Sequence, residues 1–309
     1  MHTTEAMPEL PEVETVRRGL ESAWRGREIS GVELRREGLR YPFQADLEER
    51  LLGARVTAVW RRAKYLLVEF DNGQVMVSHL GMSGKYTLVA GNEMDAKAGS
   101  NPMISEDDFI ENKHDHVVFH FSDNSYGVYT DHRRFGFIFS IEKNEVDANK
   151  FITKIGPEPL RMDGVWGESL WDAKQFAKKI QNRKSPIKTT LLDQQIVAGL
   201  GNIYVCEALH RTGIHPEKPA NELLTKAGKP SKKMVDLVAE CQLILKEAIL
   251  AGGSTLSDFK GVDGSLGYFP HQFGAYGKEG EKCNKCSKGE IHRIVQGGRS
   301  TFFCPKCQK

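Results

Sequence analysis

Hydrophobic residues recur at two different spacings along the chain, and the change between them divides it in two. In the first half, short runs rich in β-branched and aromatic residues lie between turn signals, which is typical of strands. We expect strands at residues 32–34, 55–60, 65–70, 75–79, 116–121 and 137–141, with turns at Asp71-Asn72-Gly73 and Asp123-Asn124. A helix over residues 9–24 precedes these strands, because Val13, Val16 and Leu20 lie at helical spacing.

After the segment Gly156-Pro157-Glu158-Pro159, the apolar spacing becomes helical, which marks a domain boundary. We expect helices over residues 170–180, 191–197, 203–211 and 234–251. Residues 89–112 are polar and show no sustained period, so we expect a flexible surface loop there. The fold class is therefore α+β: an N-terminal β-rich domain, either a sandwich or a barrel, with a flanking helix, followed by a C-terminal helical domain.

Composition and charge narrow the class of protein. The 309 residues are 39% hydrophobic and 27% charged, which is ordinary for a globular protein of two domains. No apolar run reaches the roughly 18 residues of a membrane-spanning helix, and residues 1–6 lack the apolar core of a secretory signal. The net charge is only +2, but residues 281–309 contain seven Lys or Arg against two Glu, giving +5 there and −3 elsewhere. A basic tail favours contact with nucleic-acid phosphate, although a solvated charged surface would have the same charge.

Four of the six cysteines form two Cys-x-x-Cys pairs near the C-terminal end, a spacing typical of a zinc site. Four thiolate ligands leave no position for water, so we expect one structural zinc ion. Disulfides are the alternative, which a reducing intracellular setting disfavours. The expected ligands are Cys283, Cys286, Cys304 and Cys307, while Cys206 and Cys241 are expected to be buried free thiols.

The span between the two pairs is long enough for one β-hairpin. About 30 residues cannot bury enough core to hold a hairpin rigid without a metal. At the centre of the span, Gly297 and Gly298 allow a tight turn, and Arg299 offers a guanidinium fork to a phosphate. A protein-binding ribbon would have the same features.

Five motifs, in the same order, resemble the formamidopyrimidine-DNA glycosylase family, and the resemblance runs from residue 7 to the C-terminal residues. They are Met7-Pro8-Glu9-Leu10-Pro11-Glu12; Arg62-Ala63-Lys64-Tyr65-Leu66 with His79-Leu80-Gly81-Met82-Ser83-Gly84; Lys113-His114-Asp115-His116 with Asp131-His132-Arg133-Arg134-Phe135-Gly136; Gly199-Leu200-Gly201-Asn202-Ile203-Tyr204; and the four-cysteine hairpin. The resemblance implies a bifunctional enzyme that excises oxidised purines (8-oxoguanine and formamidopyrimidines) from duplex DNA. It would then cleave the strand by β,δ-elimination through a Schiff base.

The resemblance also assigns catalytic roles. Pro8 would be the nucleophile, since a terminal α-amine has a pKa near 8, against about 10.4 for lysine. As a secondary amine attacking the sugar C1′, Pro8 would form a cationic iminium. Glu9 would shuttle protons during base loss, Lys64 would donate a proton in β-elimination, and Arg299 would do so in δ-elimination. Considered alone, Pro8 and Glu9 would simply begin a helix.

An enzyme that acts on a base inside a duplex extrudes the base and fills the gap. The resemblance assigns gap filling to Met82 as an apolar wedge, to Arg133 facing the orphaned cytosine and to Phe135 stacking in the helix. Considered alone, Met82 and Phe135 would be core residues. The further DNA contacts that the resemblance implies are His114, Arg183 and Asn202, the last in a helix-two-turn-helix element.

We expect three units: a catalytic β-sandwich over residues 8–155, a helix-two-turn-helix domain over 166–262 and a zinc hairpin over 275–309. The expected partner is damaged double-stranded DNA, bound in the cytosol or nucleoid by a monomer without membrane contact. Three features depart from the family pattern: the six residues before Met7, the long segment 89–112, and His132 where proline is commoner. Only the first affects catalysis, because a buried or acylated Pro8 could not react.

Two alternatives stay open. The endonuclease VIII branch of the same fold favours oxidised pyrimidines, but it usually has glycine where this chain has Leu10. Residues 263–269 resemble the base-covering loop of the purine branch. A catalytically silent DNA-damage sensor would retain Arg133, Asn202 and the zinc hairpin but lack a free Pro8 amine. A zinc hydrolase is excluded because the four-cysteine site is closed.

Overall fold

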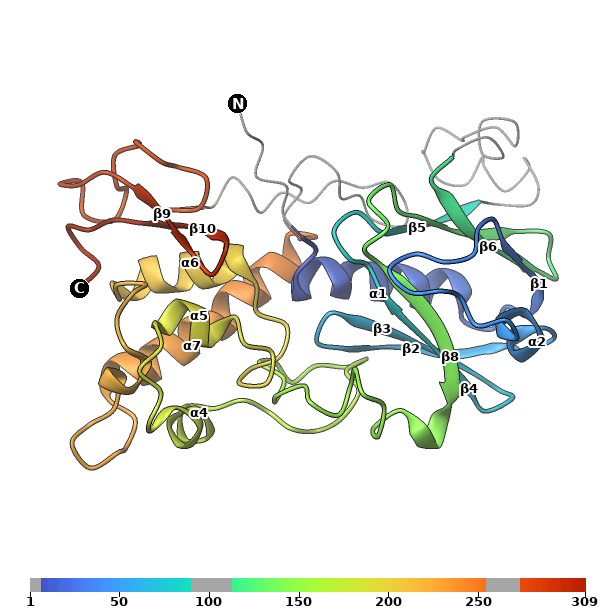
Figure 1. Ribbon diagram of the computed structural model, residues 1–309, viewed down its shortest axis with the longest axis horizontal. Helices are drawn as coiled ribbons and strands as arrows, with labels where there is room; N and C mark the ends of the chain where they lie inside the picture. Colours follow the sequence, from blue (N-terminus) through green and yellow to red (C-terminus); the bar gives the residue numbers. More distant parts are fainter. Residues whose placement is uncertain (1–6, 90–112, 254–272) are drawn as a thin grey trace.

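The computed structural model describes residues 7–89, 113–253 and 273–309, which form two domains side by side (Figure 1). Most of the expected surface loop, residues 90–112, lies outside the described residues, and so does the expected base-covering segment 263–269. No helix in the described part of the chain combines the length and apolarity needed to cross a bilayer.

The N-terminal domain is the expected β-sandwich, made of two four-stranded antiparallel sheets with the orders β1-β6-β7-β5 and β2-β3-β4-β8. The strands are β1 Ile29–Leu34, β2 Val56–Arg62, β3 Tyr65–Phe70, β4 Gln74–His79, β5 Lys85–Val89, β6 Asp115–Phe121, β7 Tyr126–Thr130 and β8 Phe137–Glu142, with a short helix α2 at Leu47–Leu51. All six predicted strands are present. Strands β5 and β7 were not predicted.

Helix α1 (Leu10–Trp24) joins the two domains. Glu9 is its N-cap, and its backbone N–H donates to the carboxylate of Glu12, completing a capping box. Leu10 packs in the core of the helical domain, whereas the rest of the inward face packs between the sheets. The residues of α1 in the sandwich core are Val13, Val16, Leu20 and Trp24. Because one helix belongs to both cores, its first turn lies at their junction.

The second domain is helical, and three of its four predicted helices are confirmed. Its helices are α4 Ala173–Ile180, α5 Ile187–Leu191, α6 Asn202–Thr212 and α7 Lys232–Leu250. The prediction of a helix over 191–197 was wrong, because α5 ends at Leu191 and the chain turns. Asp193 makes that turn: its carboxylate accepts from Gln195 N and its carbonyl from Ile196 N. The apolar spacing there reflects tertiary burial of Ile196 and Val197.

The predicted hairpin near the C-terminal end is confirmed as β9 (His292–Gln296) paired with β10 (Arg299–Phe303). Gly297 and Gly298 form the two-residue turn with φ of 55° and 73°, and a tight hairpin turn of this kind needs positive φ at both positions. Phe302 packs into the core of the helical domain, which anchors the hairpin against α6.

Candidate active site and zinc hairpin

The carboxyl group of Glu9 is buried where α1 meets the start of α6. The backbone N–H of Leu10 donates to Gly199 O at 3.2 Å, and Ile203 N donates to Glu9 Oε1 at 2.9 Å across 194 residues of sequence. A Cβ on Gly201 would lie 2.0 Å from the carboxyl carbon of Glu9. The glycine-rich motif at residues 199–204 therefore packs directly against Glu9 and Leu10, and no residue larger than glycine fits at position 201.

The environment of Glu9 suits proton transfer. Burial raises the pKa of Glu9 to about 7; nearby Lys64 opposes the rise and Glu12 adds to it. Glu9 Oε2 is buried and accepts no hydrogen bond from the described residues. A carboxyl group that is balanced between its two protonation states near neutral pH can both accept and donate a proton. Pro8, which directly precedes Glu9, is buried, and its nitrogen is an amide with Met7, so the condition set by the sequence for its reaction is not met in this chain while residues 1–7 are attached.

Lys64 lies in the two-residue turn between β2 and β3 and is only 7% exposed. Burial lowers the pKa of Lys64; Glu9 opposes the change, and the cationic Arg299 reinforces it. Arg299 is exposed at the start of β10, directly after the glycine turn. Glu9 and Lys64 lie 55 residues apart in the sequence, and Arg299 lies 235 residues after Lys64. The structure brings the three into one electrostatic neighbourhood.

The three predicted gap-filling residues lie together on the surface. The Ser83 hydroxyl accepts from Arg133 N at 3.0 Å and bonds the carboxylate of Asp131, which joins the turn carrying Met82 to the loop carrying Phe135. Phe135 is 46% exposed, and the guanidinium carbon of Arg133 lies 5.4 Å from the centre of its ring. Met82 is half-buried. Their exposure argues against the alternative that Met82 and Phe135 are core residues.

Strand pairing places this surface near Lys64. Tyr65, which follows Lys64, pairs with His79 across β3 and β4, and the turn with Met82 begins just after His79. Burial lowers the pKa of His79 to about 4, and Lys64 contributes to that change. Lys64 and the predicted gap-filling residues therefore lie at the same end of one sheet.

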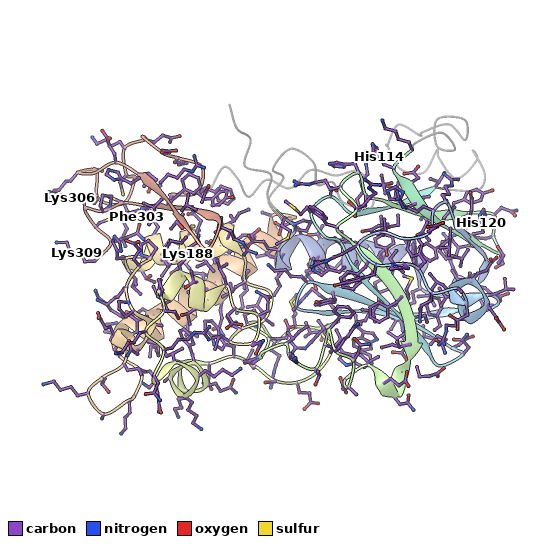
Figure 2. The ribbon with its side chains drawn as sticks, viewed as in Figure 1. His114, His120, Lys188, Phe303, Lys306 and Lys309 are labelled. Atoms are coloured by element: carbon purple, nitrogen blue, oxygen red, sulfur yellow. The ribbon has the colours of Figure 1, made fainter. Side chains whose placement is uncertain are left out.

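The other predicted DNA contacts are spread over both domains. His114 lies at the edge of the β-sandwich (Figure 2), with its ring 5.9 Å from that of His132. Arg183 follows α4 and pairs with Asp193 at 2.7 Å. Asn202 begins α6, and its amide Nδ2 donates to Ser300 O at 2.9 Å. Of the three, Asn202 adjoins the Glu9 site, because the next residue donates to Glu9.

Lys188 is a further candidate that the sequence did not indicate. Its Nζ donates to Thr301 Oγ1 at 2.6 Å and to Ser300 O at 3.2 Å, and Figure 2 places it in the helical domain. Burial lowers the pKa of Lys188; Cys206 opposes the change and Arg299 adds to it. Lys188 therefore fixes β10 immediately behind Arg299. Lysine next to polar residues is normally solvated, so no pattern in the sequence revealed this burial.

The four predicted zinc ligands converge, with all Sγ atoms within 4.8 Å of one another. The Sγ atoms of Cys283 and Cys307 are 3.8 Å apart, and so are those of Cys286 and Cys304. Tetrahedral zinc with Zn–S bonds of about 2.3 Å requires sulfur atoms about 3.8 Å apart, whereas a disulfide requires about 2.05 Å. The site fits one structural zinc ion, and the disulfide alternative was wrong. His210 of α6 places Nε2 3.3 Å from Cys283 Sγ, which links the site to the helical domain.

Cys304→Ser is expected to abolish zinc retention and to weaken DNA binding while leaving the β-sandwich folded, because the hairpin has too little core of its own. Metal content by mass spectrometry, DNA titration and circular dichroism would measure the three effects. Cys241→Ser is the matched control, since it alters a buried thiol of α7 that lies outside the cluster. Retained zinc with unchanged DNA affinity in Cys304→Ser would contradict the expectation.

A β-sandwich and a helix-two-turn-helix domain joined by one helix, with a titrating carboxyl group at the junction and a zinc hairpin beside it, define a DNA glycosylase that also cleaves the strand. Three family models match the chain in order: the formamidopyrimidine-DNA glycosylase N-terminal domain over residues 7–138, the formamidopyrimidine-DNA glycosylase H2TH domain over 155–260, and the zinc finger found in FPG and IleRS over 280–309. The chain belongs to the formamidopyrimidine-DNA glycosylase family.

Individual relatives match over nearly the whole chain. The formamidopyrimidine-DNA glycosylase of Allorhizobium ampelinum is 46% identical, over 98% of this chain and 100% of the relative. A Lactococcus lactis FPG variant solved with a DNA that contains Fapy-dG is 36% identical, with a TM-score of 0.80 and the same coverage. MutM solved with a DNA that contains carbocyclic 8-oxo-G is 37% identical, with a TM-score of 0.79 and again the same coverage.

Proposed function

We propose that this chain excises oxidised purines from duplex DNA and then cleaves the strand at the resulting abasic site. The observation that carries the proposal is the buried carboxyl group of Glu9, which adjoins Pro8 and interacts electrostatically with Lys64. The solved relatives with DNA containing Fapy-dG and carbocyclic 8-oxo-G support purine lesions as the substrate class.

In the proposed reaction, the free amine of Pro8 attacks C1′ of the damaged nucleoside, and the base departs. Glu9 shuttles the proton that opens the sugar ring, for which a pKa of about 7 is well suited. The resulting iminium withdraws electrons and acidifies the C2′ proton, whose loss expels the 3′ phosphate. Lys64 donates a proton in this β-elimination, and Arg299 does so in the second elimination that releases the 5′ side.

The DNA contacts are also proposals. Met82, Arg133 and Phe135 would fill the gap left by an extruded nucleotide, and their position together at the surface supports this proposal. Asn202 begins α6, where its amide donates to Ser300 O of the zinc hairpin, and we propose that it contacts the DNA phosphate there. The further phosphate contacts proposed are His114 and Arg183.

Organisation and setting follow from the same observations. We propose a catalytic unit over residues 8–155, a helix-two-turn-helix unit over 166–262 and a zinc unit over 275–309. The four-thiolate site and the two free buried thiols suit a reducing compartment, so we propose the bacterial cytosol or nucleoid as its location. Action as a monomer stays a prediction.

Borohydride trapping tests the proposal against a catalytically silent damage sensor. A preparation that begins at Pro8 is mixed with a duplex containing 8-oxoguanine opposite cytosine, and an enzyme should leave a covalent protein-DNA adduct. A matched duplex with an oxidised pyrimidine tests the endonuclease VIII alternative and should react more slowly. If the 8-oxoguanine duplex is bound but never trapped, the catalytic proposal is wrong and the sensor is favoured.

Arg299→Ala should slow elimination more than base excision, because the Arg299 guanidinium, at the tip of the β9–β10 hairpin, acts electrostatically on Lys64. It should also reduce the slope of log affinity against log salt by about one, the value for one lost phosphate contact. Single-turnover assays that follow base release and strand cleavage separately would measure the first effect, and titrations at several salt concentrations the second. Arg293→Ala, in the neighbouring strand, is the control and should leave the ratio of the two rates unchanged. A proportional loss of both rates in Arg299→Ala would count against the role in elimination.

A further inference from the structure

We propose that Glu158 is a positioning residue: with Arg61, it holds the β2–β3 turn so that Lys64 stays fixed relative to the start of α1. Glu158 lies in the segment between the domains that the sequence indicated only as a boundary. The catalytic consequence rests on the function proposed above for Lys64. The structural part, that the two residues fix the Lys64 turn, stands independently of it.

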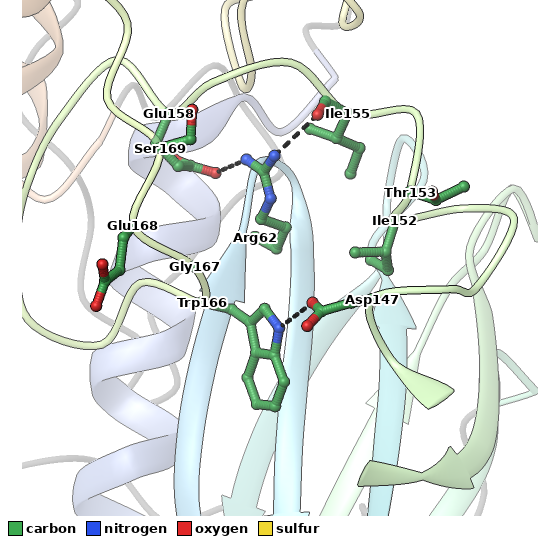
Figure 3. Close-up of a pocket in the computed structure, with 10 residues that line it drawn as sticks. All are labelled: Arg62, Asp147, Ile152, Thr153, Ile155, Glu158, Trp166, Gly167, Glu168 and Ser169. Carbon is green, nitrogen blue, oxygen red and sulfur yellow. Dashed lines mark hydrogen bonds and ion pairs between the residues drawn. The ribbon is translucent and has the colours of Figure 1, made fainter. Parts of the chain in front are cut away.

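Glu158 contacts the turn with both carboxylate oxygens and is itself 3% exposed. Its Oε1 accepts from the backbone N–H of Ala63 at 2.6 Å and from Arg62 at 2.7 Å, and its Oε2 accepts from Arg61 at 2.9 Å. Figure 3 shows Arg62 and Glu158 at the tip of the hairpin, above a pocket of about 200 Å³. The carboxylate therefore binds the residues on the N-terminal side of Lys64.

The backbone of Ala63 needs this support. Ala63 has a φ of 52°, in the left-handed region that alanine rarely adopts. Glu158 accepts from its N–H, and Arg61 Nη1 donates to its carbonyl oxygen at 3.0 Å. That carbonyl belongs to the peptide group that leads into Lys64. Both polar backbone groups of the strained residue are thus held by side chains, so external contacts and not local preference set the direction of Lys64.

The same arginine connects the turn to α1. Arg61 Nε donates to Glu14 Oε2 at 3.1 Å, and both side chains are fully buried. Glu14 belongs to the helix that begins immediately after Glu9. A chain of ion pairs therefore runs from Glu158 through Arg61 to Glu14, and it relates the position of Lys64 to that of Pro8 and Glu9.

The pKa values of Arg61 and Glu158 both shift in the direction that keeps these two side chains ionised at neutral pH. Burial opposes the charge of Arg61, but Glu158 and Glu14 outweigh burial and raise its pKa. Burial likewise opposes the charge of Glu158, and Arg61 with Arg62 lowers its pKa. Buried ion pairs often stabilise a fold no better than apolar packing, whereas they can specify one geometry. Fixed geometry is what a proton donor requires, since misplacement of about 1 Å can slow a reaction about 100-fold.

Glu158→Gln removes the charge while keeping the shape of the side chain, and Arg61→Lys keeps the charge but replaces the five-donor fork with one ammonium. The 309-residue chain carrying each change would be treated with an amine-acetylating N-hydroxysuccinimide ester, and Lys64 followed by peptide mass spectrometry. We expect acetylation of Lys64 to become several-fold faster in both variants, while buried Lys188 in the same digest is unchanged. Glu69→Gln, which breaks the Glu69 pair with Lys143 elsewhere in the sandwich, is the control and should leave Lys64 protected.

Activity then gives a second readout on variants that begin at Pro8. Glu158→Gln should slow elimination about 10- to 100-fold relative to base excision. Unchanged Lys64 acetylation in both folded variants would overturn the proposal that Glu158 and Arg61 hold the turn, and equal slowing of excision and elimination would overturn its catalytic consequence. If the parent chain never forms a borohydride adduct, the proposed function fails, but the acetylation rates still decide whether Glu158 holds the turn.

Discussion

Glu9→Gln is expected to slow base excision by about 10² to 10⁴-fold, the usual contribution of a positioned acid-base group. The same change should make the 309-residue chain more stable at pH 8. Glutamine can still accept from Ile203 N at the position of Oε1, but it cannot ionise or exchange a proton. Loss of activity with a gain in stability is the signature of a group held in an unfavourable state for function.

The pH dependence has a definite sign. Burial raises the pKa of Glu9 from 4.5 to about 7. Below pH 4.5 the group is neutral in both the folded and the unfolded chain, so it favours neither. Between pH 4.5 and 7 the unfolded chain ionises first, and the free energy of unfolding falls as pH rises. Above pH 7 the ionised Glu9 lowers the free energy of unfolding by its full amount, about 3 kcal/mol. Glu9→Gln removes this destabilisation.

Chemical denaturation of both proteins at pH 4.5, 6 and 8 would measure this difference. The two proteins should be equally stable at pH 4.5, and the variant should gain stability at higher pH. Glu207→Gln is the matched control, because the Glu207 carboxylate is buried in α6 but accepts three backbone N–H groups, those of Gly274, Ala275 and Tyr276, at 2.6–2.9 Å. It should destabilise the protein by about 1–3 kcal/mol. A pH-independent difference for Glu9→Gln would contradict the expectation.

The spacing of apolar residues predicted the helices and strands that local sequence determines. It failed where contacts with distant parts of the chain determine the local structure. Helix α1 and six strands follow from apolar spacing. Strand β7 was missed because Gly127 interrupts its pattern, and the reason for that glycine lies elsewhere in the fold. A Cβ at position 127 would lie 2.4 Å from the ring of Trp24. The glycine makes room for a side chain 103 residues earlier in the chain, and local sequence contains no trace of this requirement.

The candidate site shows the same division. The zinc ligands could be predicted, because Cys-x-x-Cys spacing carries their chemistry, and a sequence motif was enough to propose the Pro8-Glu9 pair. Lys188 and Glu158 could not, since each owes its role to partners far along the chain: Thr301 for the lysine and Ala63 for the glutamate. Both residues contact the segments that carry the proposed catalytic groups, and their roles depend on where the fold places them, not on a local sequence pattern.

The largest effect is expected from the state of Pro8 itself. In a chain that retains residues 1–7, the nitrogen of Pro8 is an amide nitrogen, and it has no basic lone pair with which to attack a sugar. A chain that begins at Pro8 offers a secondary amine with a pKa near 8, of which roughly a tenth is free base at pH 7. The first should therefore form no borohydride adduct, and the second should be trapped rapidly.

Both chains must first be shown to bind a duplex with a stable abasic-site analogue, so that a difference in trapping reflects chemistry alone. Mass spectrometry of the intact proteins would verify the first residue, and digestion of the adduct would locate the cross-link. Lys64 is the alternative nucleophile, because burial lowers its pKa and a lysine with a lowered pKa can itself attack the sugar. Equal trapping of both chains, with the cross-link at Lys64, would transfer the role of nucleophile from Pro8 to Lys64. A cross-link at Pro8 in the shorter chain alone would instead leave Lys64 in its proposed role of proton donor.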